Sequence, residues 1–328
     1  MVPPATDVTN NNNLNDNANS TDVAKNLQDQ FRNIPASVDK DDAKRAMVQA
    51  MDRVVSVPGE RLLLQAGLLP LDGAKEEPFA LFDNACGTGL ITSLLQKNMS
   101  PAVLRESRIV CADLNANLVD IVKWRAETDG WKGTVETAVL DAQDTGLPAN
   151  SFSHVVISLA MHIIPNPEAA LREAHRLLRP KGTLAFSVWA ADNAGWIPDM
   201  RSAFAALPFA APMPDRVPMA VHGLGQWVDP AGIRAELASF PPGLDHVRIE
   251  TVEHATRVDS AEYFVEAFDM MRKWLVQSYW PEESRRAATT LGDAVLNKIM
   301  IKHLQEKYDG QGWNIRWKSI LVSCQKQV

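Results

Sequence analysis

A short apolar run that passes through an acid into a turn of small residues most strongly limits how this chain folds. Residues 79–82 read Phe-Ala-Leu-Phe, Asp83 follows, and Ala85, Gly87 and Gly89 precede a second apolar segment. This order predicts a buried strand, a tight turn and a helix start, the ligand-binding corner of a doubly wound sheet. Glycine suits such a turn because no side chain holds the ligand away from the backbone.

Two cofactor classes bind at such a corner, and charge distinguishes them. A dinucleotide-binding turn reads Gly-x-Gly-x-x-Gly and directs a helix N-terminus at a pyrophosphate. Here Ala85 occupies the first glycine position, Gly87 the second, and the third glycine is offset. Asp83 would repel a pyrophosphate, but it suits the ammonium group of S-adenosylmethionine (SAM), which carries no phosphate. The pattern therefore favours SAM over NAD.

Three later segments follow this turn in an order typical of one enzyme family. The turn itself is Asp-Asn-Ala-Cys-Gly-Thr-Gly at 83–89, and the later segments are Ile-Val-Cys-Ala-Asp at 109–113, Asp-Ala-Gln-Asp-Thr-Gly-Leu-Pro at 141–148 and Glu-Ala-His-Arg-Leu-Leu-Arg-Pro-Lys-Gly at 173–182. Together they resemble the class I SAM-dependent methyltransferases. The resemblance is to the small-molecule branch, in particular fungal natural-product methyltransferases and their quinone-biosynthesis relatives. It covers residues 78–190 well and is architectural beyond them.

The resemblance implies an α/β fold of the class I methyltransferase (Rossmann-like) type. Its seven-stranded, mostly parallel sheet has helices on both faces and an α-helical lid. It also implies a SAM-dependent methyltransferase activity. The cofactor-binding residues that it implies are Asp83, Ala85, Gly87, Thr88, Asp113, Leu114, Asp141, Ala142 and Leu159.

Several of these positions also have a chemical rationale. Asp113 ends a predicted strand, where its carboxylate can accept hydrogen bonds from both ribose hydroxyls, although it can also cap the following helix. Leu114 can pack on the adenine face. Asp141 can accept from the adenine amine, and Ala142 can offer its N–H to a ring nitrogen. The alternative for Asp141 is an ordinary turn carboxylate.

Composition and the resemblance together divide the chain into four parts. Residues 1–30 are rich in Asn, Asp, Thr and Ser, which predicts a disordered tail, the alternative being a short arm that orders over the active site. Residues 31–77 are expected to form helices that cover the cofactor pocket. Residues 78–190 are expected to form the SAM-binding core, and 191–328 the lid insertions and the strands that complete the sheet.

Alternating periodicities predict a parallel sheet that is buried on both faces. Asp83 and Asp113 are thirty positions apart, which predicts a loop insertion at 98–107. Asp259-x-x-Glu262 resembles a capping box that opens a helix. The predicted strands are 79–82, 108–113, 135–140, 152–159, 183–189, 246–255 and 313–325, and the predicted helices include 39–56, 88–98, 115–127, 166–178, 193–206, 229–239 and 282–306.

The last third of the chain has a distinct aromatic composition. Seven of the nine tryptophans lie at or after Trp189. Such side chains are often core, but above a sheet they suit a flat apolar ligand. We expect parts of 193–225 and 260–280 to form a lid over a small, apolar, aromatic natural product. Oxygen is the favoured acceptor atom, followed by sulfur and nitrogen.

Methyl transfer to a phenol, thiol or amine needs at most one base to remove a proton. His162 follows the fourth predicted strand, at the edge where ligands bind in open α/β sheets. It is the first candidate for that base, and His222 in the predicted lid is the second. The alternatives are that His162 only shapes the pocket and that the reaction requires no base.

Composition also limits the partners and the compartment. A formal net charge of -7 argues against nucleic-acid or anionic-membrane partners, and no long apolar run or signal-peptide core is present. The three cysteines, Cys86, Cys111 and Cys324, have no metal-ligand spacing, so we expect a metal-free cytoplasmic enzyme acting on a small molecule. The sequence leaves the oligomeric state open.

Two other function classes remain compatible with these motifs. The first is a methyltransferase-like regulator that acts in a protein complex, with the Asn-rich N-terminus as a docking arm. The second is a SAM-binding catalyst of a non-methyl reaction. An NAD dehydrogenase is disfavoured by Ala85 and the displaced third glycine.

Overall fold

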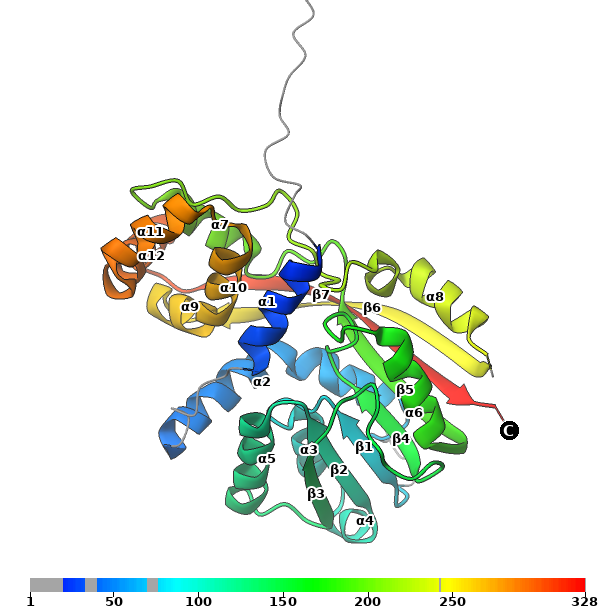
Figure 1. Cartoon of the computed structure of the whole chain (residues 1–328). Helices are drawn as coiled ribbons and strands as arrows, with labels where there is room; N and C mark the ends of the chain where they lie inside the picture. The colour runs from blue at the N-terminus through cyan, green and yellow to red at the C-terminus, as the bar shows by residue number, and fades with distance from the viewer. Residues whose placement is uncertain (1–19, 33–39, 70–75, 242, 328) are drawn as a thin grey trace, which may run out of the picture.

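The computed structural model describes residues 20–32, 40–69, 76–241 and 243–327 (Figure 1). Its strands are β1 (Ala80–Asn84), β2 (Arg108–Asp113), β3 (Thr134–Val139), β4 (Phe152–Ile157), β5 (Leu178–Trp189), β6 (Leu244–Val258) and β7 (Trp313–Lys326). They form one sheet in the order β3-β2-β1-β4-β5-β7-β6. Strands β1 to β5 pair in parallel, and β7 is antiparallel to β5 and β6. The predicted seven-stranded, mostly parallel fold is therefore confirmed.

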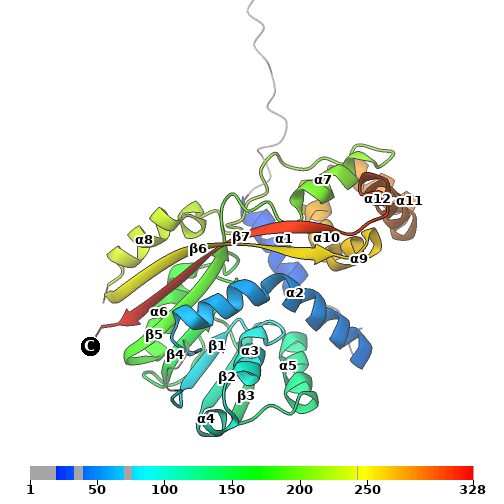
Figure 2. The same ribbon diagram turned by 180° about the vertical axis from the view of Figure 1, so that it is seen from behind.

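Helices cover both faces of this sheet. They are α1 (Ser20–Arg32), α2 (Asp41–Gln65), α3 (Leu90–Asn98), α4 (Pro101–Glu106), α5 (Ala116–Thr128), α6 (Pro167–Leu177), α7 (Ile197–Ala205), η2 (Gly225–Val228), α8 (Pro230–Ser239), α9 (Ala261–Ala267), α10 (Asp269–Tyr279), α11 (Glu282–Leu291) and α12 (Asp293–Lys307). Successive strand residues point to opposite faces. Leu81 thus packs with α2 and α3, whereas Phe82 packs on the opposite face with α6 and α8. Figure 2 shows α2, α3 and α5 together on their face.

A third hydrophobic core lies beyond the sheet and includes parts of 193–225 and 260–280, from which we expect a lid; we call this helical unit the lid. It joins α1, α7, α9, α10 and α12 to the far ends of β6 and β7, as Figure 1 shows. The buried carboxylate of Asp199 on α7 ties this unit together. It accepts hydrogen bonds from Lys307 (2.7 Å), Tyr308 (2.5 Å) and Trp313 (2.8 Å). Three donors compensate for the loss of water around this charge, so α7 is fixed against α12 and β7.

Helix α1 corrects the prediction of a disordered tail over residues 1–30. Residues 20–30 are helical, and residues 1–19 lie outside the described residues. Val23 and Leu27 are one helical turn apart and are buried against the lid core. The indole N–H of Trp274 on α10 donates to the Val23 carbonyl at 3.1 Å. The helix therefore depends on tertiary contacts that its polar composition does not reveal.

Helix α2 crosses from the lid to the sheet and continues through Pro58. Proline has no N–H to donate to the carbonyl of Val54, four residues earlier. The ring Nε2 of His254 on β6 replaces that donor, at 2.9 Å from the Val54 oxygen. Two residues before Val54, Asp52 of α2 accepts from buried Arg125 of α5 at 2.5 Å. These two contacts fix one turn of α2 against β6 and α5.

Three predicted boundaries are wrong. The loop predicted at 98–107 contains the short helix α4. The helix predicted to open at the Asp259 capping box is capped instead by Ser260, whose hydroxyl accepts from Tyr263 N, and Asp259 pairs with Arg53 of α2. The helix predicted at 282–306 breaks at Gly292, which has φ 82°. In the part of the chain that the structure describes, no helix combines the length and apolar character needed to cross a membrane.

Candidate active site

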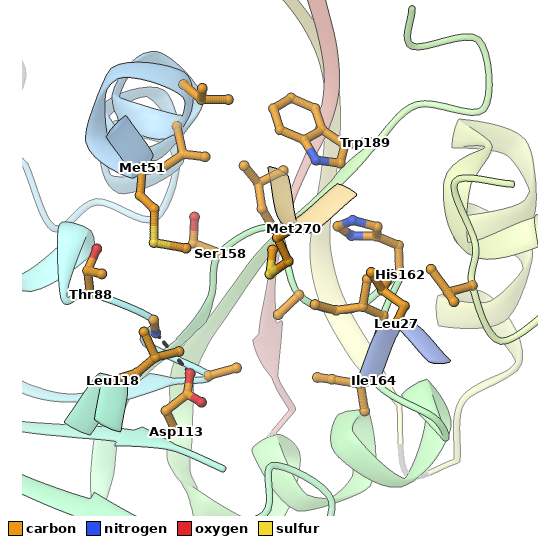
Figure 3. A pocket seen from close by; sticks show the side chains of 18 of the residues that line it. Leu27, Met51, Thr88, Asp113, Leu118, Ser158, His162, Ile164, Trp189 and Met270 are labelled. Carbon is orange, nitrogen blue, oxygen red and sulfur yellow. Dashed lines mark hydrogen bonds between the residues drawn. The ribbon is translucent and has the colours of Figure 1, made fainter. Parts of the chain in front are cut away.

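A cavity of about 420 Å³ lies at the carboxyl ends of the strands, where the strand order reverses between β1 and β4. This is the edge at which open α/β sheets bind ligands. One side is formed by the loops after β1, β2, β3 and β4, and the other by α1, α2, the lid and β7 (Figure 3). The lining includes every predicted cofactor residue, namely Asp83, Ala85, Gly87, Thr88, Asp113, Leu114, Asp141, Ala142 and Leu159.

Asp83 presents a buried carboxylate to this cavity. Its side chain accepts from the Thr92 hydroxyl at 3.0 Å through Oδ2, while Oδ1 has no hydrogen-bond partner among the described residues. The residue is 1% exposed, and burial raises its pKa to about 7 against the opposing Thr92 hydrogen bonds. An unpartnered buried oxygen is costly, and an ammonium group from a ligand would satisfy it. Asp83 therefore fits the amino-acid end of SAM.

We call the set of predicted cofactor residues that line the cavity the cofactor cradle. Gly87 and Asp113 form the next part of it. Gly87 has φ 54°, and a Cβ built on it would meet no atom within 4 Å, so its backbone is open to a ligand. Its N–H donates to Asp113 Oδ2 at 3.0 Å, and the N–H of Asn115 donates to Oδ1 at 2.9 Å. Asn115 itself caps α5. Asp113 is thus not the cap, and its carboxylate has lone pairs left for ribose hydroxyls; burial raises its pKa.

The adenine end of the cradle combines an apolar side chain with a polar turn. Leu114 lines the cavity and yet is 46% exposed, which leaves an apolar surface for a flat ring to cover. The polar part of this end is Asp141, whose Oδ1 accepts from the side-chain NH₂ and the backbone N–H of Gln143, each at 2.9 Å. Asp141 and Ala142 adjoin one another in this turn. Both oxygens of Asp141 accept from Gln143, as in the turn-carboxylate alternative, so the adenine contacts of Asp141 and Ala142 stay a prediction.

Two non-glycine residues hold unfavourable backbone conformations around the cradle. Ala85 has φ 55° and Leu159 has φ 51°. Such conformations persist where surrounding structure enforces them, and they cluster at functional sites. The Leu159 N–H is fixed by the Ser187 hydroxyl at 2.9 Å. On the other side, buried Arg125 holds the carbonyl of Thr88 at 3.0 Å.

The two candidate bases differ in position. His162 lines the cavity, is 5% exposed, and has no described hydrogen-bond partner for Nδ1 (Figure 3). Burial, with a smaller contribution from the nearby His222, lowers its pKa to about 3. The imidazole is therefore neutral near pH 7 and can accept a proton or a hydrogen bond.

His222, the second candidate base, lies outside the lining and has both ring nitrogens engaged, which favours a structural role. It is not among the cavity-lining residues. Its Nδ1 accepts from Leu224 N at 3.1 Å, so Nε2 carries the proton and faces the Met161 carbonyl at 3.3 Å. Both ring nitrogens are occupied, and burial lowers the pKa of the ring. His222 attaches the loop before η2 to the loop after β4.

The side of the cavity away from the cradle is aromatic and sulfur-rich, and we call it the acceptor chamber. Trp189 and Trp317 lie next to each other there, with ring centroids 5.0 Å apart. Sequence patterns did not single out Leu27 of α1 or Asn193 after β5, which also line the cavity. Leu27 had a weak signal in its four-residue spacing from Val23, but Asn193 had none. The acceptor chamber consists of Met51, Trp189, Trp196, Met219, Phe268, Met270, Met271, Trp274 and Trp317.

Comparisons with known proteins agree with this geometry. Residues 82–186 match a family described as methyltransferase domain. The methyltransferase tpcH of Aspergillus fumigatus is 31% identical over 262 residues, which cover 79% of this chain and 88% of that protein. The acetylaranotin bis-thiomethyltransferase of Aspergillus terreus is 27% identical over 210 residues, covering 64% of this chain and 70% of that protein.

A solved structure supports the fold alone. Phosphoethanolamine N-methyltransferase 2 of Haemonchus contortus superposes with a TM-score of 0.51 at 12% identity, covering 92% of this chain and 60% of that chain. The sheet order, the motif loops around one cavity and the fungal relatives lead to the same assignment. The chain belongs to the class I SAM-dependent methyltransferases, in the branch that contains these fungal enzymes.

Proposed function

We propose that this enzyme methylates a small, apolar, aromatic natural product, with a hydroxyl oxygen as the favoured acceptor atom. The observation that carries the proposal is the continuity of one cavity, in which the cofactor cradle opens directly onto the acceptor chamber. A chamber of tryptophan, phenylalanine and methionine side chains favours flat, polarizable, poorly hydrated ligands. The small volume, about 420 Å³, is in the range of small-molecule sites rather than of macromolecular grooves.

Bound SAM supplies an electrophilic methyl group on its sulfonium. The task of the protein is to align the acceptor with that group and to exclude water. Asp83 holds the amino-acid group of the cofactor and Asp113 its ribose in this proposal, which directs its reactive centre toward the chamber. Leu27 and Met51, from the two N-terminal helices, line the cavity and keep water out.

His162 is the proposed proton acceptor. It lies in the loop after β4, on the lining of the cavity. Its Nδ1 has no described partner, so a hydroxyl or thiol proton of the acceptor would satisfy a buried nitrogen that is otherwise unpaired. As the methyl group is transferred, the acceptor proton passes to His162 and later to solvent.

A thiol is the second candidate acceptor. The low pKa of His162, about 3, makes it a weak base, and a thiol with an ordinary pKa of about 8.5 ionises more readily than a phenol at about 10. The relative from Aspergillus terreus, named as a bis-thiomethyltransferase, also supports sulfur.

Methyl transfer from labelled SAM to a panel of naphthols, naphthalenethiols, arylamines and aryl carboxylates tests the proposal. We expect a phenol or thiol to take the label, and we expect His162→Ala to lower kcat by about a hundredfold. The matched variant His222→Ala should retain transfer and lose thermal stability instead. An equal loss of kcat in both variants, without loss of SAM binding, would contradict the role of His162. SAM binding with no transfer to any class would contradict the proposal itself.

A further inference from the structure

Asn193 places one fixed amide in the otherwise apolar half of the cavity. It follows β5, is 7% exposed, and lines the cavity beside the acceptor chamber. Its Oδ1 accepts from the N–H of Lys318 on β7 at 2.8 Å, and its own N–H donates to Ala190 O at 2.9 Å. The Lys318 bond assigns the amide orientation, because only the oxygen can accept. The NH₂ group is therefore the end that remains for another partner.

That NH₂ group is poorly satisfied within the protein. Among the described residues, its acceptor is Met219 Sδ, at 3.9 Å. A thioether sulfur is a weak hydrogen-bond acceptor, so this contact compensates little for the burial of the amide. A buried amide donor costs free energy when it lacks a good acceptor. Asn193 thus keeps donor capacity that a ligand can use.

The surroundings of Asn193 are suited to an aromatic ring. Gly195, with φ 48°, lies against both Trp317 and Asn193. A Cβ at this position would come within 2.8 Å of the Trp317 ring and 3.3 Å of Asn193 Nδ2. Trp189 packs on Trp317 from β5. The absence of a side chain at residue 195 therefore allows the amide to sit close to the edge of an indole wall.

His162 and Asn193 share one neighbouring segment. The carbonyl of His162 accepts from Val221 N at 3.0 Å, and Met219, two residues earlier, contacts Asn193. Outside the loops after β1, β2 and β3, the polar side chains in the described lining of the cavity, apart from indole N–H groups, are Ser158, His162 and Asn193. His162 can accept a proton, whereas the Asn193 NH₂ group can donate a hydrogen bond, so the two suit different atoms of the same ligand.

We propose that Asn193 Nδ2 binds a second oxygen of the acceptor, one that carries no proton, such as an aryl carbonyl. The acceptor is then an aromatic phenol or thiol with a carbonyl-type substituent rather than a plain hydroxylated hydrocarbon. This inference rests on the proposed function, since it assigns the substrate class of the same cavity. It makes Asn193 a specificity-determining residue.

Two isosteric probes test the subsite by binding alone. They are 6-acetyl-2-naphthol and 6-isopropenyl-2-naphthol, which differ by a carbonyl oxygen in place of a methylene group. Calorimetry would measure each on the full chain saturated with S-adenosylhomocysteine. We expect the acetyl probe to bind at least about tenfold tighter, because only it accepts the amide hydrogen bond. Asn193→Asp keeps the acceptor for Lys318 N but removes the amide donor, and should abolish this preference at mildly alkaline pH.

The matched control is Asp192→Asn, which changes the adjacent exposed residue and its ion pair with Lys318 and should keep the preference. Equal binding of the two probes to the wild type, binding of neither, or a preference that survives Asn193→Asp would overturn the subsite. The two proposals fail separately. Probe discrimination without methyl transfer to any acceptor would contradict the proposed function and leave the subsite intact, whereas methyl transfer without discrimination would do the reverse.

Discussion

The charge state of Asp83 should control cofactor affinity near neutral pH. The carboxylate is buried, its Oδ1 has no described partner, and burial raises its pKa to about 7. An ammonium ligand binds the ionised form and lowers that pKa, so binding releases a proton. The direction of the pH dependence of cofactor affinity follows directly. Affinity is full above the pKa of the free protein and falls as the pH drops below it.

The magnitude follows from the same value. At about one unit below the pKa roughly one molecule in eleven carries ionised Asp83, and at one unit above it roughly ten in eleven do. The dissociation constant should therefore rise about tenfold from about pH 8 to about pH 6, or about 1.4 kcal/mol. Asp83→Asn removes this titration and should give weaker, flatter binding. Asp113 has a raised pKa in the same cavity, so any residual slope in the variant reports on Asp113.

Calorimetric titration with S-adenosylhomocysteine, which keeps the amino-acid ammonium, measures both proteins across this range. A wild-type affinity that does not change with pH would refute the reasoning. So would a slope in Asp83→Asn as steep as that of the wild type, because another group would then be responsible.

Two further predictions concern the contacts of α2. Arg125→Met should lower the free energy of unfolding by roughly 3 kcal/mol, because Asp52 loses its charge partner. Adding Asp52→Asn to Arg125→Met should lower the free energy of unfolding by less than Asp52→Asn does alone. Strictly additive losses in urea titrations would contradict the coupling. His254→Ala should cost about 1–3 kcal/mol by leaving the Val54 carbonyl unpaired. Pro58→Ala should recover part of that loss by restoring a backbone N–H, and no recovery would show that this carbonyl is not the cause.

The cofactor side of the site could be predicted because its signals are local in the sequence. An acid at a strand end, small residues in a turn and a following helix identify Asp83, Gly87 and Asp113 without tertiary information. Each of them lines the cavity. The parallel pairing of the core strands followed from the alternation of apolar strands and amphipathic helices, which allows few topologies.

The acceptor side could not be predicted to the same depth, because its residues meet only through tertiary packing. Helix α1 has two buried apolar positions in a polar segment, and contacts with α10 stabilise it. His222 resembled a base in the sequence, and its occupied ring nitrogens appear only once the loop is folded. Asn193 carries no sequence signal at all, since its role depends on a backbone partner more than a hundred residues away.

A crystal structure with S-adenosylhomocysteine bound would test the central claim most directly, namely that one cavity joins the cofactor cradle to the acceptor chamber. We expect the amino group of the ligand at Asp83, its ribose hydroxyls at Asp113, and its sulfur facing the chamber beside His162. A ligand bound outside this cavity, or reversed so that its sulfur faces away from the chamber, would contradict it.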